Sequence, residues 1–108
     1  MKEKTVFYKL AQTESDFCIS SVTHYEIGLG NKKSHSQFWN RLHNSLTVIP
    51  FDKYCSSTAI EIYIELKNKN KMIDIADIWI AATAKTHNIK IATLNHKHFS
   101  RISGLEII

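Results

Sequence analysis

The segment that decides the fold lies in the second half of the chain and reads Ile73-Asp74-Ile75-Ala76-Asp77-Ile78-Trp79-Ile80-Ala81-Ala82-Thr83-Ala84. Apart from its two acidic residues it is almost wholly apolar, and a helix that is hydrophobic all round is a buried one. An unpaired charge in such a place is costly unless it is neutralised. Asp77 therefore needs a compensating partner: a metal ion, a basic side chain, or a helix-cap position that reaches solvent.

Short apolar runs alternate with helical patterns along the rest of the chain. Helices are expected near 5–12, over a segment that Ser21 or Thr23 caps and that ends at about 30, over 34–44, after Asp52 and across 73–87. Strands are expected over 17–20, 46–49, 89–93 and 105–108. Short apolar strands that alternate with helices are typical of an α/β fold with a parallel sheet. The pattern predicts one domain over residues 1–108, with the sheet flanked by helices.

Two helices carry more detailed predictions. Asp52 is a good N-cap residue for the long helix that follows it. Trp79, at helical spacing from Ile75 and Ala82, is interpreted as a core residue and not as a platform for stacking bases. The apolar stripe of the helix after Asp52 is predicted to consist of Ala59, Ile60, Tyr63, Ile64 and Leu66.

Composition narrows the class of protein. The chain has 108 residues with 44% hydrophobic and 22% charged residues, which is typical of one globular domain, and only three Gly and one Pro, which leaves no long linker. No apolar stretch reaches the ~18 residues that a membrane span needs. We therefore expect a cytoplasmic protein without membrane contact, in which Cys18 and Cys55 stay reduced.

The net charge of +4 is compatible with a nucleic-acid partner. The positive residues are spread over Lys32 and Lys33, the connection 67–71, and Lys97 with Arg101. Each group can also be read as an ordinary solvated face. His96 and His98 are the only closely spaced histidines, and one such pair is weak support for a metal site.

Candidate site residues follow from the expected sheet, because parallel sheets bind ligands at the carboxyl ends of their strands. The segments 20–26 and 93–95 fall at such ends. Both segments can also have a purely structural role. Thr23-x-x-Glu26 has the spacing of a capping box, and Thr93 to Asn95 can form a plain turn. Asp74 can cap the helix of 73–84, with Asp77 in its first turn, where the helix dipole favours a negative charge.

Taken in order, four segments resemble the PIN-domain ribonucleases and, within them, the VapC toxins of bacterial toxin–antitoxin pairs. Residues 19–30 resemble a strand-then-helix motif, 48–52 the next strand and cap, and 74–82 the D-x-x-I-A-A motif. Residues 91–99 followed by Gly104-Leu105-Glu106 are similar to the terminal T-x-N-x-x-(D/H)-F…G-L motif. The order and spacing of the four, which span nearly the whole chain, carry the resemblance.

The resemblance implies a metal-dependent endoribonuclease toxin of a type II pair, inhibited by an antitoxin protein. It implies Glu26 and Asp77 as ligands of Mg²⁺ or Mn²⁺ and as catalytic residues together with Asn95, with Thr93 and His98 contacting the RNA substrate. It also implies a homo-oligomer. Dimer and antitoxin contacts would come from the early helices, for which Phe7, Tyr8, Phe38 and Trp39 are candidates.

The chain departs from the family pattern at two places. The family opens with a strand that ends in a metal-binding Asp, and this chain is expected to lack that strand, since Asp16 precedes the next strand instead of ending the first. The position that often carries a fourth Asp is His98 here, which weakens the anionic site. An alternative function follows: a non-catalytic PIN-domain remnant or interaction protein that binds an antitoxin without cutting RNA.

Overall fold

The computed structural model describes residues 18–30, 47–93 and 95–107. In chain order, its elements are β1 (Cys18–Ser20), α2 (Ser21–Gly30), β2 (Thr47–Ile49), α4 (Lys53–Lys69), α5 (Ile75–Thr86) and α6 (His96–Phe99). The helices predicted near 5–12 and over 34–44 lie outside the described residues, and so do Phe7, Tyr8, Phe38 and Trp39.

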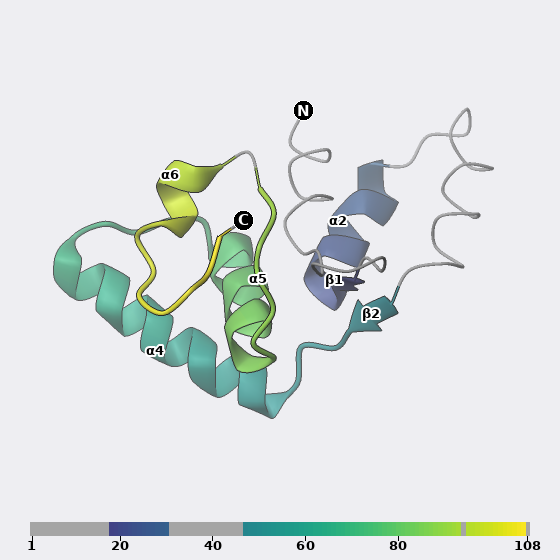
Figure 1. Ribbon diagram of the computed structural model, residues 1–108, viewed down its shortest axis with the longest axis horizontal. Coiled ribbons are helices and arrows are strands. Elements are labelled where there is room, and N and C mark those ends of the chain that lie inside the picture. Colours follow the sequence, from purple (N-terminus) through teal and green to yellow (C-terminus); the bar gives the residue numbers. More distant parts are fainter. Residues whose placement is uncertain (1–17, 31–46, 94, 108) are drawn as a thin grey trace.

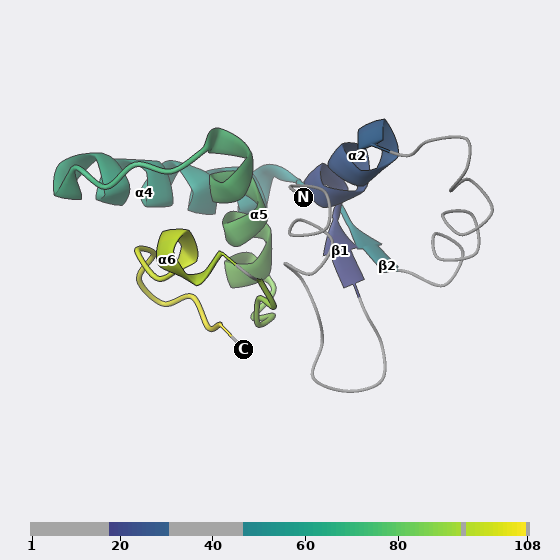
Figure 2. The same ribbon diagram turned by 90° about the horizontal axis from the view of Figure 1, so that it is seen from above.

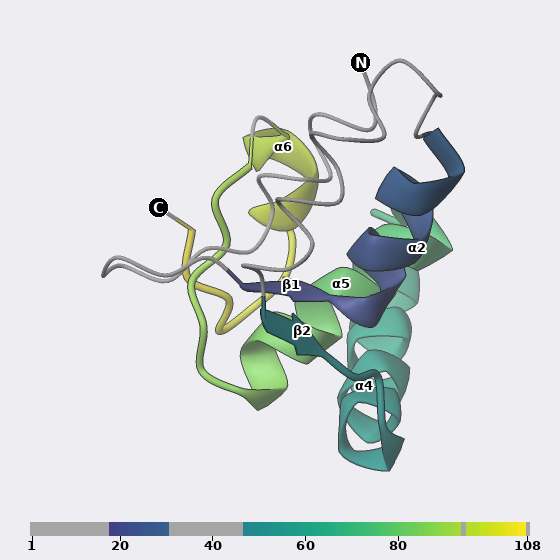
Figure 3. The same ribbon diagram turned by 90° about the vertical axis from the view of Figure 1, so that its right-hand side faces the viewer.

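Helix α5 lies between two groups of elements. Figures 1 and 2 show α4 and α6 on one side of it and α2, β1 and β2 on the other. Helix α5 packs against α4, α2 and β1. Figure 3 shows the strand pair from its own side, with α2 leading away from the end of β1. Parallel strands flanked by helices confirm the predicted α/β class.

The strands pair in parallel, as predicted. Strands β1 and β2 are in register with Ile19 opposite Val48. Within the described residues, the predicted strands 89–93 and 105–108 pair through one parallel bridge between Ile91 and Ile107, where Ile91 N donates to Glu106 O at 2.9 Å. Ile89 N bonds back to Ala84 O at 2.9 Å, so the first residue of the predicted strand 89–93 is still tied to the end of α5.

Helix α2 begins one residue earlier than expected. Ser20 Oγ accepts a hydrogen bond from Thr23 N at 2.9 Å, so Ser20 is the N-cap residue and the prediction of Ser21 or Thr23 as the cap was wrong. Strand β1 ends at Ser20, which leaves no residue between strand and helix. Ser21 Oγ accepts instead from Phe51 N at 3.1 Å and ties the residue after Pro50 to the start of α2.

The cap of α4 is confirmed, and its apolar stripe needs correction. The carboxylate of Asp52 accepts hydrogen bonds from Tyr54 N and Cys55 N, each at 3.1 Å. The buried face follows a spacing of four, three and four residues and consists of Cys55, Ala59, Ile62 and Leu66. The helix turns the predicted Ile60, Tyr63 and Ile64 to its exposed side.

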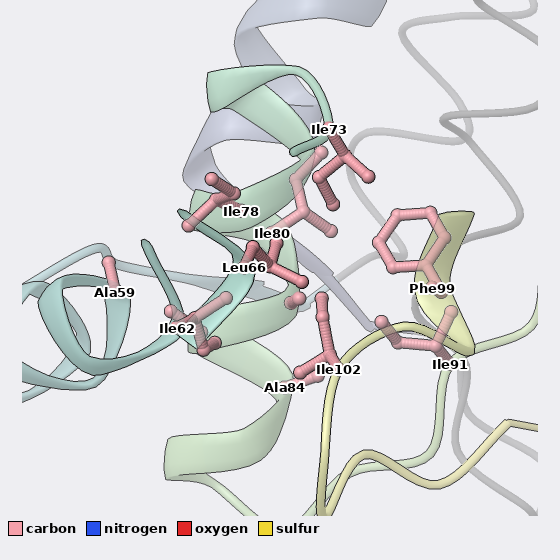
Figure 4. Packing of buried hydrophobic residues seen from close by; sticks show 12 residues of the cluster. Ala59, Ile62, Leu66, Ile73, Ile78, Ile80, Ala84, Ile91, Phe99 and Ile102 are labelled. Carbon is pink, nitrogen blue, oxygen red and sulfur yellow. The ribbon is translucent and has the colours of Figure 1, made fainter. Parts of the chain in front are cut away.

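The hydrophobic core lies where α4, α5 and α6 meet (Figure 4). Phe99 from α6 is fully buried in it, together with Ile91 and Ile102 from the neighbouring loops. Trp79, predicted to be core, is 42% exposed, so that prediction was wrong. Its ring lies against that of the partly buried Phe51, with 5.7 Å between the ring centroids.

The expectations about the cysteines and about membrane-spanning helices can be compared with the structure. Cys18 and Cys55 are buried thiols that are not joined in a disulfide. None of the described helices combines the length and the apolarity that a bilayer crossing requires.

Candidate functional site

Asp77 lies in the first turn of α5 and is only 4% exposed. Asp74 occupies the predicted N-cap position, with φ −60° and ψ 144°, but its side chain makes no capping hydrogen bond. Two acids at one helix start thus differ, because Asp74 is exposed and Asp77 is buried. The positive end of the helix dipole favours the negative charge of Asp77 at this position.

Glu26 lies in the second turn of α2, and its Oε1 atom is buried. The capping-box reading of Thr23 and Glu26 was wrong, because Ser20 is the cap and Thr23 is already the third helical residue. Helix α2 packs against α5 and against β1. The fold therefore brings the helices that carry Glu26 and Asp77 together.

Thr93, Asn95 and His98 form a local network after the Ile91 bridge. Thr93, which is 7% exposed, accepts a hydrogen bond through Oγ1 from Asn95 N at 2.9 Å. Asn95 Nδ2 lies 2.9 Å from His98 Nδ1. When this amide donates to Nδ1, the proton of the neutral ring sits on Nε2, which is then a donor. The predicted turn is present, and it orients the polar residues.

Two buried hydroxyls were missed by the sequence interpretation. Ser20 Oγ donates to Thr23 Oγ1 at 3.1 Å, and both residues are fully buried at the junction of β1 and α2. The available signal was a Ser at the end of an apolar run with a polar residue three positions later, which is the usual mark of an N-cap. These hydroxyls fix the start of the helix that carries Glu26.

The described residues contain no cluster of three or more His, Cys, Asp or Glu side chains that could hold a metal ion. The carboxylate donors among the predicted site residues are Glu26 and Asp77. Mg²⁺ prefers oxygen ligands and commonly binds through one or two carboxylates while it keeps several waters. A pair of acids on contacting helices fits a hydrated ion of this kind, and a histidine- or cysteine-rich cage is not formed by these residues.

Comparison with known proteins places the chain in a family. The PIN domain profile matches residues 2–105. The VapC ribonuclease Y4jK of Sinorhizobium fredii is 31% identical, over 91% of this chain and 77% of that protein. Ribonuclease VapC1 of Methanocaldococcus jannaschii is 42% identical over 62 residues, which are 56% of this chain and 40% of that protein. This match thus spans less than half of the Methanocaldococcus protein.

A solved structure has the same fold. The VapBC2 complex of Rickettsia felis, bound to a DNA fragment from its promoter, contains a chain that is 30% identical with a TM-score of 0.73. The likeness covers 84% of this chain and 72% of that one. The profile match over nearly all residues, the relative in Sinorhizobium and the shared fold agree: the chain belongs to the VapC group of the PIN domain family.

Proposed function

We propose that this chain is a metal-dependent endoribonuclease toxin of a type II toxin–antitoxin pair. Family membership and the names of its relatives, which are VapC ribonucleases, support the reaction class. The observation that carries the proposal is the packing of α2 against α5, the two helices that carry Glu26 and Asp77, with Asp77 only 4% exposed in the first turn of α5. Two carboxylates on contacting helices suit a divalent cation, which prefers oxygen ligands.

Glu26 and Asp77 would hold Mg²⁺ or Mn²⁺. When bound, such an ion lowers the pKa of a coordinated water and neutralises charge that develops on the phosphate. The two helices contribute position: α5 presents Asp77 from its first turn, and the Ser20 cap fixes the start of α2. Both carboxylates are carried by helices that pack against each other, which would preorganise the pair for an ion.

Asn95, Thr93 and His98 would contact the RNA. In the arrangement where Asn95 donates to His98 Nδ1, the Oδ1 atom of Asn95 can orient a water molecule and His98 Nε2 can donate to a phosphate oxygen. Thr93 holds the Asn95 backbone in place through its 2.9 Å hydrogen bond. We assign Asn95 to catalysis and Thr93 and His98 to substrate binding.

The same proposal covers organisation and partners. Residues 1–108 form a single PIN-like domain that acts in the cytoplasm, where its RNA is found, and associates as a homo-oligomer. An antitoxin protein binds and inhibits it, by analogy with the Rickettsia complex of the toxin–antitoxin type.

RNA cleavage by the 108-residue chain with Mg²⁺ or Mn²⁺ tests the function, beside a chelated sample. Asp77→Asn should lower the rate at least about 100-fold, because several kcal/mol of transition-state stabilisation depend on the ion. Asp74→Asn is the matched control, since Asp74 is exposed on the same helix and should leave the rate nearly unchanged. Cleavage that survives Asp77→Asn would indicate a contaminating nuclease and contradict the site.

A second candidate is a non-catalytic protein that binds an antitoxin. The observation that favours it is the small donor set, with two candidate carboxylates and no larger ligand cluster among the described residues. It predicts a folded chain, recognised by circular dichroism and a cooperative melt, that cuts no RNA with either metal. Metal-dependent cutting that Asp77→Asn abolishes would exclude this alternative.

A further inference from the structure

A basic pocket lies between the end of α4 and α6. It has a volume of about 470 Å³ and is lined by Asn70, Lys71, Met72, Lys97, Ser100 and Arg101. Three of these side chains are cations and none is an acid. The volume falls in the range of roughly 300–1,000 Å³ that is usual for ligand sites. A second described cavity of about 460 Å³ is different, because both Lys85 and Glu106 line it.

The wall formed by residues 70–72 is held in place by main-chain bonds. Asn70 adopts the left-handed conformation, with φ 58°, at the end of α4. Lys71 N donates to Leu66 O at 2.9 Å, which is the pattern of a closed helix terminus. The backbone that carries Lys71 therefore continues from α4 as a fixed turn.

Arg101 connects the wall of residues 70–72 to the opposite wall, which residues 97–101 form. Its Nη1 donates to Met72 O at 3.1 Å and to Lys71 O at 3.4 Å, across about thirty residues of sequence. The opposite wall is ordered by Ser100 N, which donates to His96 O at 2.8 Å. A guanidinium has five N–H donors, so Arg101 keeps donors for an anion after it has fixed the loop.

The pocket adjoins the elements of the proposed catalytic site. Lys97 is two residues from Asn95, and Met72 is five residues from Asp77, so at most about 18 Å separates the Cα atoms of Met72 and Asp77. Figure 1 shows α6 beside the connection from α4 to α5. An extended strand whose scissile phosphate lies at the carboxylates can therefore place a nearby phosphate in the pocket.

We propose that this basic pocket binds a backbone phosphate of the RNA strand and so positions the strand across the Glu26–Asp77 site. The inference rests on the proposed ribonuclease function, which it deepens by assigning a second substrate contact. The chemistry is that of lysine and arginine with phosphate oxygens, which contact the backbone without reading its sequence.

Binding of a short, fluorescently labelled 2′-O-methyl RNA by the full chain, in a chelator and over a range of salt concentrations, tests the pocket without catalysis. The double variant Lys71→Gln, Lys97→Gln should bind at least about tenfold more weakly, with a salt slope reduced by roughly 0.7, since each phosphate contact on a single strand contributes about 0.7. Lys90→Gln removes an exposed lysine at the start of the Ile89–Thr93 segment and should bind like the unchanged chain.

The outcomes separate the explanations. An unchanged affinity in the double variant, or an equal loss in Lys90→Gln, would overturn the pocket. Polyglutamate that competes as well as RNA at equal charge would overturn the assignment to RNA in favour of an acidic protein. All three lysines are exposed, so thermal melts should coincide and a folding defect would be visible.

Cleavage measured on the same preparations distinguishes this inference from the ribonuclease proposal. If the double variant binds and cuts RNA like the unchanged chain, the phosphate-binding role of the pocket is overturned and the ribonuclease proposal stands. Pocket-dependent binding by a chain that never cuts would support the phosphate site and overturn the ribonuclease.

Discussion

The candidate acidic site and the basic pocket lie on elements that share one hydrophobic core, but the two sites are built in opposite ways. Asp77 is 4% exposed in the first turn of α5, and most residues of this helix are buried. Lys71 and Lys97 are exposed, and their pocket is held together by hydrogen bonds to main-chain carbonyls. The acidic site is positioned by packing of the core, and the basic pocket is positioned by hydrogen bonds at the surface.

This difference determines how each region should respond to change. A buried carboxylate is sensitive to whatever neutralises it, because the surrounding protein is a poor solvent for charge. Exposed lysines contribute mostly to long-range attraction and are screened by salt. Substitutions in one region should therefore leave the other region unaffected, whereas a substitution in the shared core should affect both.

The largest effect is expected for Phe99→Ala, which removes a fully buried ring from the core that α6 shares with α4 and α5. The free energy of unfolding should fall by about 3–5 kcal/mol, as measured by urea denaturation. Both regions should suffer, since α6 borders the pocket and follows Asn95. His96→Ala, an exposed change in the same helix, should stay within ~0.5 kcal/mol. Similar losses in both variants would contradict the packing role of Phe99.

The next effect concerns the acidic site alone. Glu26→Gln or Asp77→Asn should weaken Mn²⁺ binding at least about tenfold in isothermal titration calorimetry, or ~1.4 kcal/mol, because each removes one charged ligand. Asp74→Asn is the control and should bind Mn²⁺ normally. RNA binding through the basic pocket in a chelator should be unaffected in all three. Equal Mn²⁺ affinity across the set would contradict the ligand assignment.

A smaller effect is expected at Asp52, which lies in neither region but starts the helix that supports both. The N–H of Cys55 lowers the pKa of Asp52, with a further contribution from Tyr54 N. The charged cap therefore stabilises the folded chain above the unfolded-state pKa of about 3.9, and this stability is lost as the pH falls through the lowered folded-state value. Asp52→Ala should reduce the melting temperature by a few degrees at neutral pH. Asp52→Asn should retain much of the cap but lose its pH dependence, which melts between pH 3 and pH 7 would reveal.

The smallest effect is expected for Glu65→Gln on the exposed side of α4. Lys69 Nζ lies 2.6 Å from Glu65 Oε2, to which Ser103 Oγ also donates, and these bonds lower the pKa of Glu65. The charged form therefore stabilises the chain above the unfolded-state pKa, and the gain is lost as the pH falls through the lowered value. Solvent screening limits it to under about 1 kcal/mol. Denaturation at low and high salt should show the difference between variant and parent shrinking with salt.

Much of the architecture could be predicted from local pattern. The α5 segment, the Asp52 cap and the parallel pairing of β1 with β2 were all correct, because apolar periodicity and capping chemistry are local. The errors came from tertiary contacts. In α4 the buried position is Ile62, and Ile60 and Ile64 are exposed. Trp79 contacts the ring of Phe51 but is 42% exposed.

The candidate site divides along the same line. The resemblance to the PIN-domain ribonucleases selected Glu26, Asp77, Thr93, Asn95 and His98. The apolar run around Asp77 and the expected strand ends at 20–26 and 93–95 pointed to the same parts of the chain. The sequence alone could not decide between a capping box and another role for Glu26, since that depended on whether β1 ended at Ser20.

The order of elements, the buried helix and the chemical types at the candidate site therefore follow from the amino-acid sequence. Which lysines lie together depends on the three-dimensional fold. Lys71 and Lys97 are far apart in the chain and looked like separate solvated residues, until the Arg101 contacts closed residues 71 and 72 against α6. Charge along a chain is local information, whereas a pocket needs two segments brought together by burial of the residues between them.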